Sequence, residues 1–194
     1  MTSNDQWKFI DGWLPLARRV PSPNKDNRPH GAQPELIVIH SISLPPGKYG
    51  GGNIEALFTN TLQHSAHPYY KGIYKLKVSA HFLVERSGEL VQFVSTDARA
   101  WHAGKSCWKG RENCNDFSIG IELEGCETDR YLNIQYEVLS ALVVELQKRY
   151  PLISSDAIVG HSNIAPGRKT DPGLSFDWRK LQERVDRKRG DGSK

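Results

Sequence analysis

The segment 161–171, HSNIAPGRKTD, brings together side chains of three types that can do chemistry jointly. It supplies an imidazole at His161, an ammonium at Lys169 and a carboxylate at Asp171. Histidine nitrogen and aspartate oxygen both bind Zn²⁺, and a neighbouring lysine can stabilise negative charge that develops on a substrate oxygen. A Pro-Gly pair interrupts the segment, which predicts a loop and not a helix. The alternative is a turn whose polar residues cap neighbouring elements, because the spacing alone is not specific.

A third zinc ligand has to come from elsewhere, because catalytic zinc sites usually have three protein ligands and one open position for water. His40 ends the apolar run ELIVI, and α/β folds place their chemistry at such strand ends, which favours it over a histidine satisfied within a loop. His81 lies inside a predicted strand, where a packed histidine is as plausible as a ligand. His102 lies in a Trp-His-Ala-Gly loop, which favours a contact with substrate.

Two glutamates at the end of the run SIGIELE are candidates for the general base that a zinc hydrolase needs. Glu122 is flanked by apolar residues, which favours a fixed and partly buried side chain, whereas Glu124 is the better candidate for a surface carboxylate. Residues two apart on a strand point to the same face, so the spacing does not choose between them. The chain has no G-x-S-x-G elbow, P-loop or C-x-x-C pair.

Apolar runs and periodicity predict the elements that must position these residues. The predicted strands cover 35–39, 78–84, 90–94, 118–123 and 158–159, and the predicted helices cover 54–62 and 135–150. A Ser-Gly turn joins the second and third strands into a hairpin. The Pro/Gly-rich segment 41–53 is either a mobile lid or a static connection. Strands mixed with two clear helices predict a single α/β (α+β) domain, with a central mixed β-sheet flanked by helices.

Length and charge bound the organisation of the chain. Its 194 residues are enough for one domain with a sizeable core. Residues 1–34 are rich in Pro, Asn and Arg and predict an irregular N-terminal arm whose aromatic residues pack on a main domain of residues 35–178. Residues 178–194 contain seven Lys/Arg and three Asp/Glu, so they carry the whole net charge of +4. We therefore expect residues 179–194 to form a solvated, fraying basic tail, and we expect no nucleic-acid partner.

Targeting and cysteine patterns favour the cytoplasm. No secretory signal and no apolar run of about 18 residues is visible, so no membrane partner is expected. The odd set of Cys107, Cys114 and Cys126 predicts reduced thiols, with a bridge between the first two as the alternative. We expect a monomer.

Four stretches, in the same order, resemble the AmpD-type amidases: IVIHSISLPPGKYGGG, VSAHFLVERSGELVQFV, RAWHAGKSCWKGRENCNDFSIGIELEG and GHSNIAPGRKTDPG. These are cytoplasmic 1,6-anhydro-N-acetylmuramoyl-L-alanine amidases of peptidoglycan recycling in Gram-negative bacteria, and the resemblance runs from about Trp13 to Trp178. It implies a peptidoglycan-recognition-protein-like amidase fold, which makes residues 35–178 a zinc amidase domain. It also implies Zn²⁺ as the cofactor and anhydro-muropeptide as the substrate.

The resemblance implies a role for each residue of the site. It assigns His40, His161 and Asp171 to the metal, and Glu122 and Lys169 to catalysis. His81 becomes a structural histidine. Phage-lysozyme relatives have a catalytic tyrosine just before that histidine, and this chain has Ala80, so the work falls to Glu122.

The positions implied for substrate binding depart from the family pattern. Trp101 offers an apolar face to the sugar, with core packing as the alternative, and His102 lies beside it. Family members often have arginine where this chain has Lys77 and Asn113, and asparagine where it has Ser41. Lysine and asparagine cannot reproduce bidentate arginine contacts, so a weaker grip on the acidic stem peptide is expected.

Two other functions compete with a recycling amidase. One is a peptidoglycan-binding module without activity, and the presence of all three implied ligands and Glu122 argues against it. The other is a periplasmic amidase that acts on intact cell wall, and the missing signal argues against it.

Overall fold

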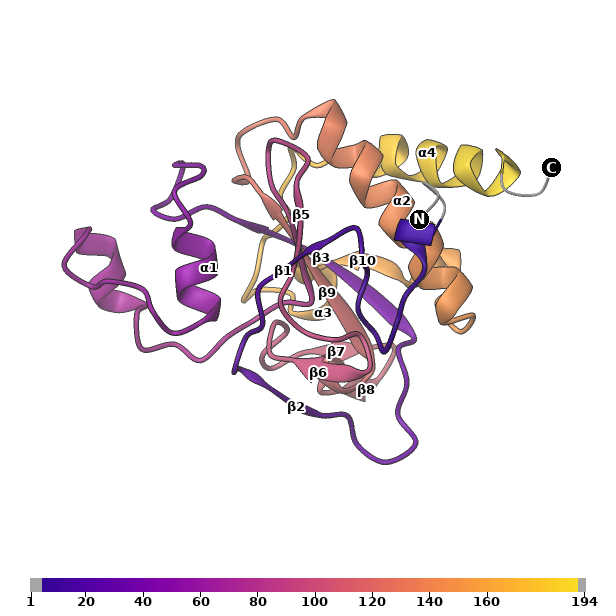
Figure 1. The fold of residues 1–194 in the computed structure, drawn as a ribbon, viewed down its shortest axis with the longest axis horizontal. Coiled ribbons are helices and arrows are strands. Elements are labelled where there is room, and N and C mark those ends of the chain that lie inside the picture. The colour runs from indigo at the N-terminus through magenta and orange to yellow at the C-terminus, as the bar shows by residue number, and fades with distance from the viewer. Residues whose placement is uncertain (1–4, 192–194) are drawn as a thin grey trace.

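The structure is a computed structural model that describes residues 5–191. Its centre is a six-stranded mixed sheet with the strand order β1-β5-β4-β9-β3-β10 (Figure 1). The strands are β1 Arg18–Arg19, β3 Leu36–Ile42, β4 Phe82–Val84, β5 Leu90–Gln92, β9 Ser118–Glu124 and β10 Ile158–Gly160. The pair β4/β5 is antiparallel and the other neighbouring pairs are parallel. Two short antiparallel ribbons accompany the sheet: β2 Lys25–Asn27 with β6 Ala98–Ala100, and β7 Cys107–Trp108 with β8 Arg111–Glu112.

Helices cover both faces of the sheet and enclose a hydrophobic core on each side. The helices are α1 Asn53–Phe58, α2 Asn133–Arg149, α3 His161–Ile164 and α4 Trp178–Asp191, and the 3-10 turns are η1 Asp5–Trp7, η2 Pro68–Gly72, η3 Cys114–Asp116 and η4 Ser155–Ala157. In Figure 1, α2 and α4 lie side by side on one flank, and α1 lies on the opposite flank. The larger core packs α2 against β3 and β9, and the smaller one packs α1 against β5 and the chain that follows it.

The predicted fold class, a single α/β domain with a central mixed sheet flanked by helices, is confirmed. Each predicted strand and both predicted helices are present, with ends that shift by a few residues. The helix predicted over 54–62 ends at Phe58, and the strand predicted over 78–84 begins only at Phe82. The strand starts late because the backbone N–H of Ser79 donates to the carbonyl oxygen of Trp101 (3.1 Å) instead of to a neighbouring strand of the sheet.

The N-terminal arm is more regular, in its described part, than the predicted irregular segment 1–34. β1 pairs in parallel with β5 and forms an edge of the main sheet, while β2 pairs with β6. Trp7 and Phe9 pack against the larger core. Strands of two or three residues are too short to show an alternating pattern, and this is why the sequence did not reveal them.

The expectation of a solvated, fraying tail over residues 179–194 is wrong for its described part, which forms α4 as far as Asp191. Leu181 and Val185 are only 3% and 1% exposed, and they join the larger core beneath α2. These two residues are four apart, so they lie on one face of the helix. Two apolar residues among many charged ones do not produce a clear helical period in the sequence. They are nevertheless enough to pack α4 against α2.

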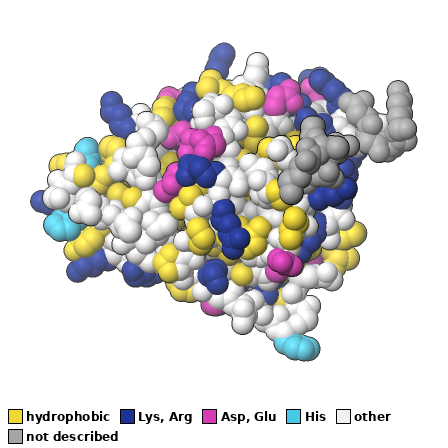
Figure 2. All heavy atoms as spheres, viewed as in Figure 1, with side chains coloured by type: hydrophobic (Ala, Val, Ile, Leu, Met, Phe, Trp, Pro, Cys, Tyr) yellow, Lys and Arg dark blue, Asp and Glu magenta, His cyan; other side chains and the backbone are white. Residues whose placement is uncertain are grey.

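The basic residues of α4 are partly paired with acidic ones. Arg184 and Lys188 both form ion pairs with Glu137 of α2, the second at 3.5 Å, and Arg179 pairs with Glu183 at 2.8 Å. On the face shown in Figure 2, Lys and Arg side chains lie in several separate places, one of them at the end of the molecule where α4 lies. The positive charge of this region is thus partly used to hold α4 on α2.

No helix within residues 5–191 combines the length and the apolar character that crossing a membrane requires. Cys107 is exposed, Cys114 is buried and Cys126 is half-buried, and all three are free thiols.

Replacement of the buried leucine of α4, Leu181→Ala, should lower the free energy of unfolding by about 2–5 kcal/mol, because it removes apolar contacts and leaves a cavity beneath α2. Urea denaturation monitored by circular dichroism measures this change. The matched control is Leu174→Ala, because Leu174 is fully exposed and its truncation should change the free energy of unfolding by less than about 0.5 kcal/mol. Equal stability of the two variants would mean that α4 does not pack on α2.

Candidate metal centre

The sheet topology brings two histidines together at the carboxyl ends of its parallel strands. His40 of β3 is in register with Glu122 of β9, so the two side chains lie on the same face of the sheet. β10, the other neighbour of β3, ends at Gly160 opposite Ile39, and the chain passes directly into His161. Ligand sites of α/β proteins commonly lie at this edge of a sheet.

The segment 161–171 begins with one helical turn, α3, so the prediction of a loop is wrong for its first four residues. The Pro-Gly pair that suggested a loop comes only after this turn. The backbone N–H of Ser162 donates to the carbonyl oxygen of Asp171 (3.0 Å) and ties the two ends of the segment together. This bond places the carboxylate of Asp171 beside the imidazole of His161.

The nearest side-chain atoms of His40, His161 and Asp171 form a small triangle, and they are the one cluster of this kind found within residues 5–191. The two Nδ1 atoms lie 3.0 Å apart, and Oδ2 of Asp171 lies 3.2 Å from Nδ1 of His40 and 3.1 Å from Nδ1 of His161. A tetrahedral ion with bonds of roughly 2.0–2.2 Å separates its ligand atoms by about 3.3–3.6 Å, so a small side-chain adjustment accommodates it. Two imidazoles and one carboxylate are also a known ligand set of catalytic zinc.

The outer nitrogen of His161 fixes the tautomer of its ring. His161 Nε2 lies 3.1 Å from the carbonyl oxygen of Ala103. A carbonyl can only accept, so Nε2 carries the proton and Nδ1 presents its lone pair to the triangle.

A longer chain of hydrogen bonds assigns the same tautomer to His40. Its Nε2 lies 2.9 Å from Nδ1 of His102, and Nε2 of His102 lies 3.2 Å from the hydroxyl oxygen of Ser118. That hydroxyl donates to the carbonyl oxygen of Cys114, so each proton along the chain points away from His40. Nδ1 of His40 is therefore also a lone pair that faces the triangle.

The electrostatics favour the protonation states that bind a metal. Burial lowers the pKa of His40 to about 4, which keeps its ring neutral at pH 7. Neutral imidazoles and an ionised carboxylate are the metal-binding forms. Three lone pairs about 3 Å apart are favourable only with a cation between them, and we conclude that the residues fit Zn²⁺.

The ring of His102 lies over a glycine of β9. A Cβ atom at Gly120 would come within 2.4 Å of the His102 ring, so only glycine allows this approach. Both ring nitrogens of His102 are engaged within the protein, to His40 and Ser118, and a contact of this residue with substrate stays a prediction. His81, the remaining candidate ligand, is fully buried outside the triangle, and its Nδ1 accepts the N–H of Gly120 (3.0 Å).

The two glutamates of β9, which the spacing left undecided, have different surroundings. Both oxygens of Glu124 accept backbone N–H groups, from Gly50 and from Arg86 (3.0 Å). Glu122 is 8% exposed, and its buried Oε2 has no hydrogen-bond partner. Burial raises the pKa of Glu122 well above its usual range, Asp171 adds to the rise, and the charge of Lys169 opposes it. Of the two carboxylates, Glu122 is thus the one that keeps an oxygen without a protein partner.

A cavity of about 580 Å³ opens beside the triangle, and Glu122, Lys169 and Trp101 all line it. Lys169 is exposed to solvent, and the ring of Trp101 is held by a hydrogen bond from Nε1 to Asp26 (3.2 Å). An apolar part of the lining comes from the loop after β3, from α1 and from η2 with the chain that follows it: Leu44, Leu57, Phe58, Tyr69, Ile73, Leu76 and Val78.

The structure does not bring the remaining predicted substrate residues to the lining of this cavity. Lys77 is exposed between Leu76 and Val78, which do line it. Asn113 lines a separate cavity of about 250 Å³ beside Arg168. Contacts of Lys77 and Asn113 with a stem peptide stay predictions. Sequence reasoning missed the apolar wall formed by segment 69–78, because its apolar residues follow neither a helical nor a strand period.

Comparison with known proteins agrees with this geometry. Residues 30–174 match the family described as N-acetylmuramoyl-L-alanine amidase. The chain belongs to this family. The matched residues run from just before β3 to just beyond Asp171, so they include all three residues of the triangle.

Individual relatives within the family are more specific about which amidases this chain resembles. It is 57% identical over 175 residues to the 1,6-anhydro-N-acetylmuramyl-L-alanine amidase AmpD of Citrobacter freundii, covering 90% of this chain and 93% of the relative. The crystal structure of a selenomethionine derivative of AmpD has a TM-score of 0.89 at 56% identity, covering 91% and 98% of the two chains. AmpDH3 of Pseudomonas aeruginosa, in complex with an anhydromuramic pentapeptide, has a TM-score of 0.61 at 30% identity, covering 80% and 61%. The predicted family, amidase activity and amidase fold are confirmed.

One Zn²⁺ per chain is expected from this donor set, and His161→Ala should lose nearly all of it because one of three ligands is gone. Elemental analysis of the purified proteins gives the metal content. His30→Ala serves as the control, because His30 is exposed and lies outside the triangle. Full zinc occupancy in His161→Ala would refute the ligand assignment.

Proposed function

We propose that this amidase hydrolyses, with Zn²⁺ as cofactor, the amide bond between the lactyl group of 1,6-anhydro-N-acetylmuramic acid and L-alanine in muropeptides. The observation that carries the proposal is the unpaired Oε2 of Glu122 in the cavity that holds the triangle of His40, His161 and Asp171. The substrate class is supported by two relatives, AmpD, whose name states this activity, and AmpDH3, whose structure contains an anhydromuramic pentapeptide.

The ligand residues prepare the site for the ion. Bound Zn²⁺ would polarise the scissile carbonyl and acidify the attacking water. Hydrogen bonds that the outer Nε2–H groups donate hold His40 and His161 in the tautomer whose Nδ1 lone pairs face the site. The buried surroundings of the two rings strengthen electrostatic interactions there, because little water screens them.

Glu122 moves the proton in the proposed reaction. Its carboxylate accepts a proton from the attacking water as the oxygen–carbon bond forms, and it returns that proton to the amide nitrogen as the carbon–nitrogen bond breaks. The products are the lactyl carboxylate and the free amine of L-alanine. The raised pKa of Glu122, caused first by burial, suits both halves of this transfer because it brings the two protonation states closer in free energy near neutral pH.

Lys169 and Trp101 complete the proposed site from the walls of the cavity. The ammonium of Lys169 offsets the negative charge that develops on the carbonyl oxygen in the transition state. The ring of Trp101 offers an apolar face to the sugar, and its bond to Asp26 keeps that face in place.

The proposed role is peptidoglycan recycling in the cytoplasm, supported by the similarity to AmpD. We expect the protein to act as a monomer. Mass spectrometry of products from anhydro-muropeptide and from intact cell wall tests the substrate. We expect free anhydro-N-acetylmuramic acid and the intact stem peptide from the first substrate, and little product from the second. Efficient release of peptide from intact wall, without turnover of the anhydro substrate, would instead favour a periplasmic amidase.

Glu122→Gln should retain zinc and fold but lose roughly 10²–10⁴-fold in kcat, the usual contribution of general acid–base catalysis. The matched control is Glu124→Gln on the same strand, which should lose some stability through its bonds to Gly50 and Arg86 and keep most of its activity. Steady-state kinetics and metal analysis of both variants measure this. An inactive Glu124→Gln beside an active Glu122→Gln would reverse the assignment.

Lys169→Met should shift the acid limb of the kcat/KM profile to higher pH. The charge of Lys169 lowers the pKa of Glu122, so its removal lets that pKa rise further. Glu122 begins the reaction ionised, so activity disappears as the pH falls through its pKa, and in the variant this loss begins at a higher pH. The pH–rate profile of the zinc-loaded proteins shows the shift, with Lys105→Met, on the separate cavity, as the control. An acid limb that stays in place or moves to lower pH would contradict the prediction.

A further inference from the structure

The dipeptide His102–Ala103 contacts both histidines of the metal centre. The ring of His102 meets Nε2 of His40 at 2.9 Å, and the carbonyl oxygen of Ala103 meets Nε2 of His161 at 3.1 Å. This dipeptide therefore aims two imidazoles that come from different elements, β3 and α3. A displacement of this dipeptide would turn both rings at once.

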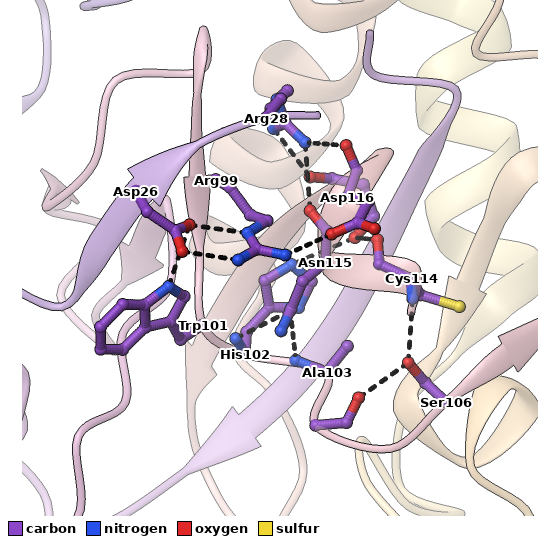
Figure 3. A network of polar contacts seen from close by, with 12 residues as sticks. Asp26, Arg28, Arg99, Trp101, His102, Ala103, Ser106, Cys114, Asn115 and Asp116 are labelled. Carbon is purple, nitrogen blue, oxygen red and sulfur yellow. Dashed lines mark hydrogen bonds and ion pairs between the residues drawn. The ribbon is translucent and has the colours of Figure 1, made fainter. Parts of the chain in front are cut away.

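A single side-chain oxygen fixes the position of the dipeptide. Oδ1 of Asn115 accepts the backbone N–H of His102 (3.1 Å) and the backbone N–H of Ala103 (2.8 Å). Figure 3 shows Asn115 beside the two residues, with dashed lines for these bonds. An amide oxygen has two lone pairs, so it can hold both N–H groups together. Asn115 itself does not belong to the ligand triangle.

The backbone of Asn115 is held from the N-terminal arm. Nη1 of Arg28 donates to the carbonyl oxygens of Asn115 (3.2 Å) and Asp116 (3.0 Å), and Nη2 donates to that of Ser118 (2.9 Å). Figure 3 shows the guanidinium of Arg28 next to η3, the turn that carries Asn115. The side-chain oxygen of Asn115 thus projects from a fixed turn and not from a free loop.

We propose that Asn115 is a positioning residue of the metal centre, which acts through His102 and Ala103 to aim the Nδ1 atoms of His40 and His161. The inference rests on the proposed zinc function and adds a residue that touches neither metal nor substrate. Its function requires a double hydrogen-bond acceptor at position 115. A carboxylate can replace the amide in that role, and an apolar side chain cannot.

Zinc affinity, measured by competition with a chromophoric chelator, tests the proposal without reference to activity. Asn115→Ala should weaken zinc binding roughly 10–100-fold, the usual effect of losing an outer support of a metal site. Asn115→Asp keeps an oxygen that accepts both N–H groups and should recover most of the affinity. The matched control is Asp116→Ala in the same 3-10 turn, which breaks the ion pair with Arg99 but leaves both bonds of Asn115 intact, and it should bind zinc normally.

Native zinc affinity in Asn115→Ala, or an equal loss in Asp116→Ala, would overturn the proposal. Asn115→Gln is a second test variant, because the longer side chain displaces the amide oxygen by one methylene. Its zinc affinity should fall at least about tenfold. If Asn115→Ala does not fold, the result for Asn115→Gln decides the test. Absence of zinc binding in the native protein would reject the proposed function itself. Normal binding in the native protein and in both of these Asn115 variants would reject only the role of Asn115.

Discussion

Three lone pairs directed at one point are the constraint on which the rest of this structure depends. The side chains of His40, His161 and Asp171 place atoms 3.0–3.2 Å apart, and such atoms repel one another unless a cation lies among them. The fold has to supply the energy that keeps them together before a metal binds. It does so through the register of β3 with β10, through the bond between Ser162 and Asp171, and through partners for both outer imidazole nitrogens.

The strand β9 carries two glutamates, one of which lines the candidate site while the other stabilises the fold. Glu122 and Glu124 point to the same face, and the difference between them lies only in what surrounds them. Both carboxylate oxygens of Glu124 accept hydrogen bonds, from the backbone N–H groups of Gly50 and Arg86. Glu124 thereby connects the loop after β3 to the β4/β5 hairpin. Movement of segment 41–53 as a lid would have to break the first of these bonds. Glu122 keeps one buried oxygen unpaired, a cost that the fold tolerates beside a metal site.

The sequence predicts those elements that are marked by a continuous apolar run or by a helical period over several turns. The apolar runs around His40 and Glu122 identify two central strands, and the period of α2 identifies its buried face. The identity of the third metal ligand and of the catalytic carboxylate depends on contacts between distant segments. The spacing of residues along the chain therefore does not predict either of them. The resemblance to a family implies an answer to both choices, and the cluster of His40, His161 and Asp171 and the unpaired oxygen of Glu122 support that answer. Two-residue strands and the narrow apolar stripe of α4 escaped prediction because their stability comes from tertiary packing and not from periodicity.

Support for the metal centre extends beyond the segment that the family match defines. That match begins at residue 30, whereas the guanidinium of Arg28 lies against η3 and donates to carbonyl oxygens there. No ion pair with a carboxylate is found for Arg28 among the described residues, and burial lowers its pKa to about 10, so the group still carries its charge at pH 7. A half-buried cation that donates to several carbonyl oxygens is costly to remove, because each carbonyl would lose its donor. The arm that carries Arg28 is therefore part of the scaffold that holds Asn115, and through it the two histidines, in place.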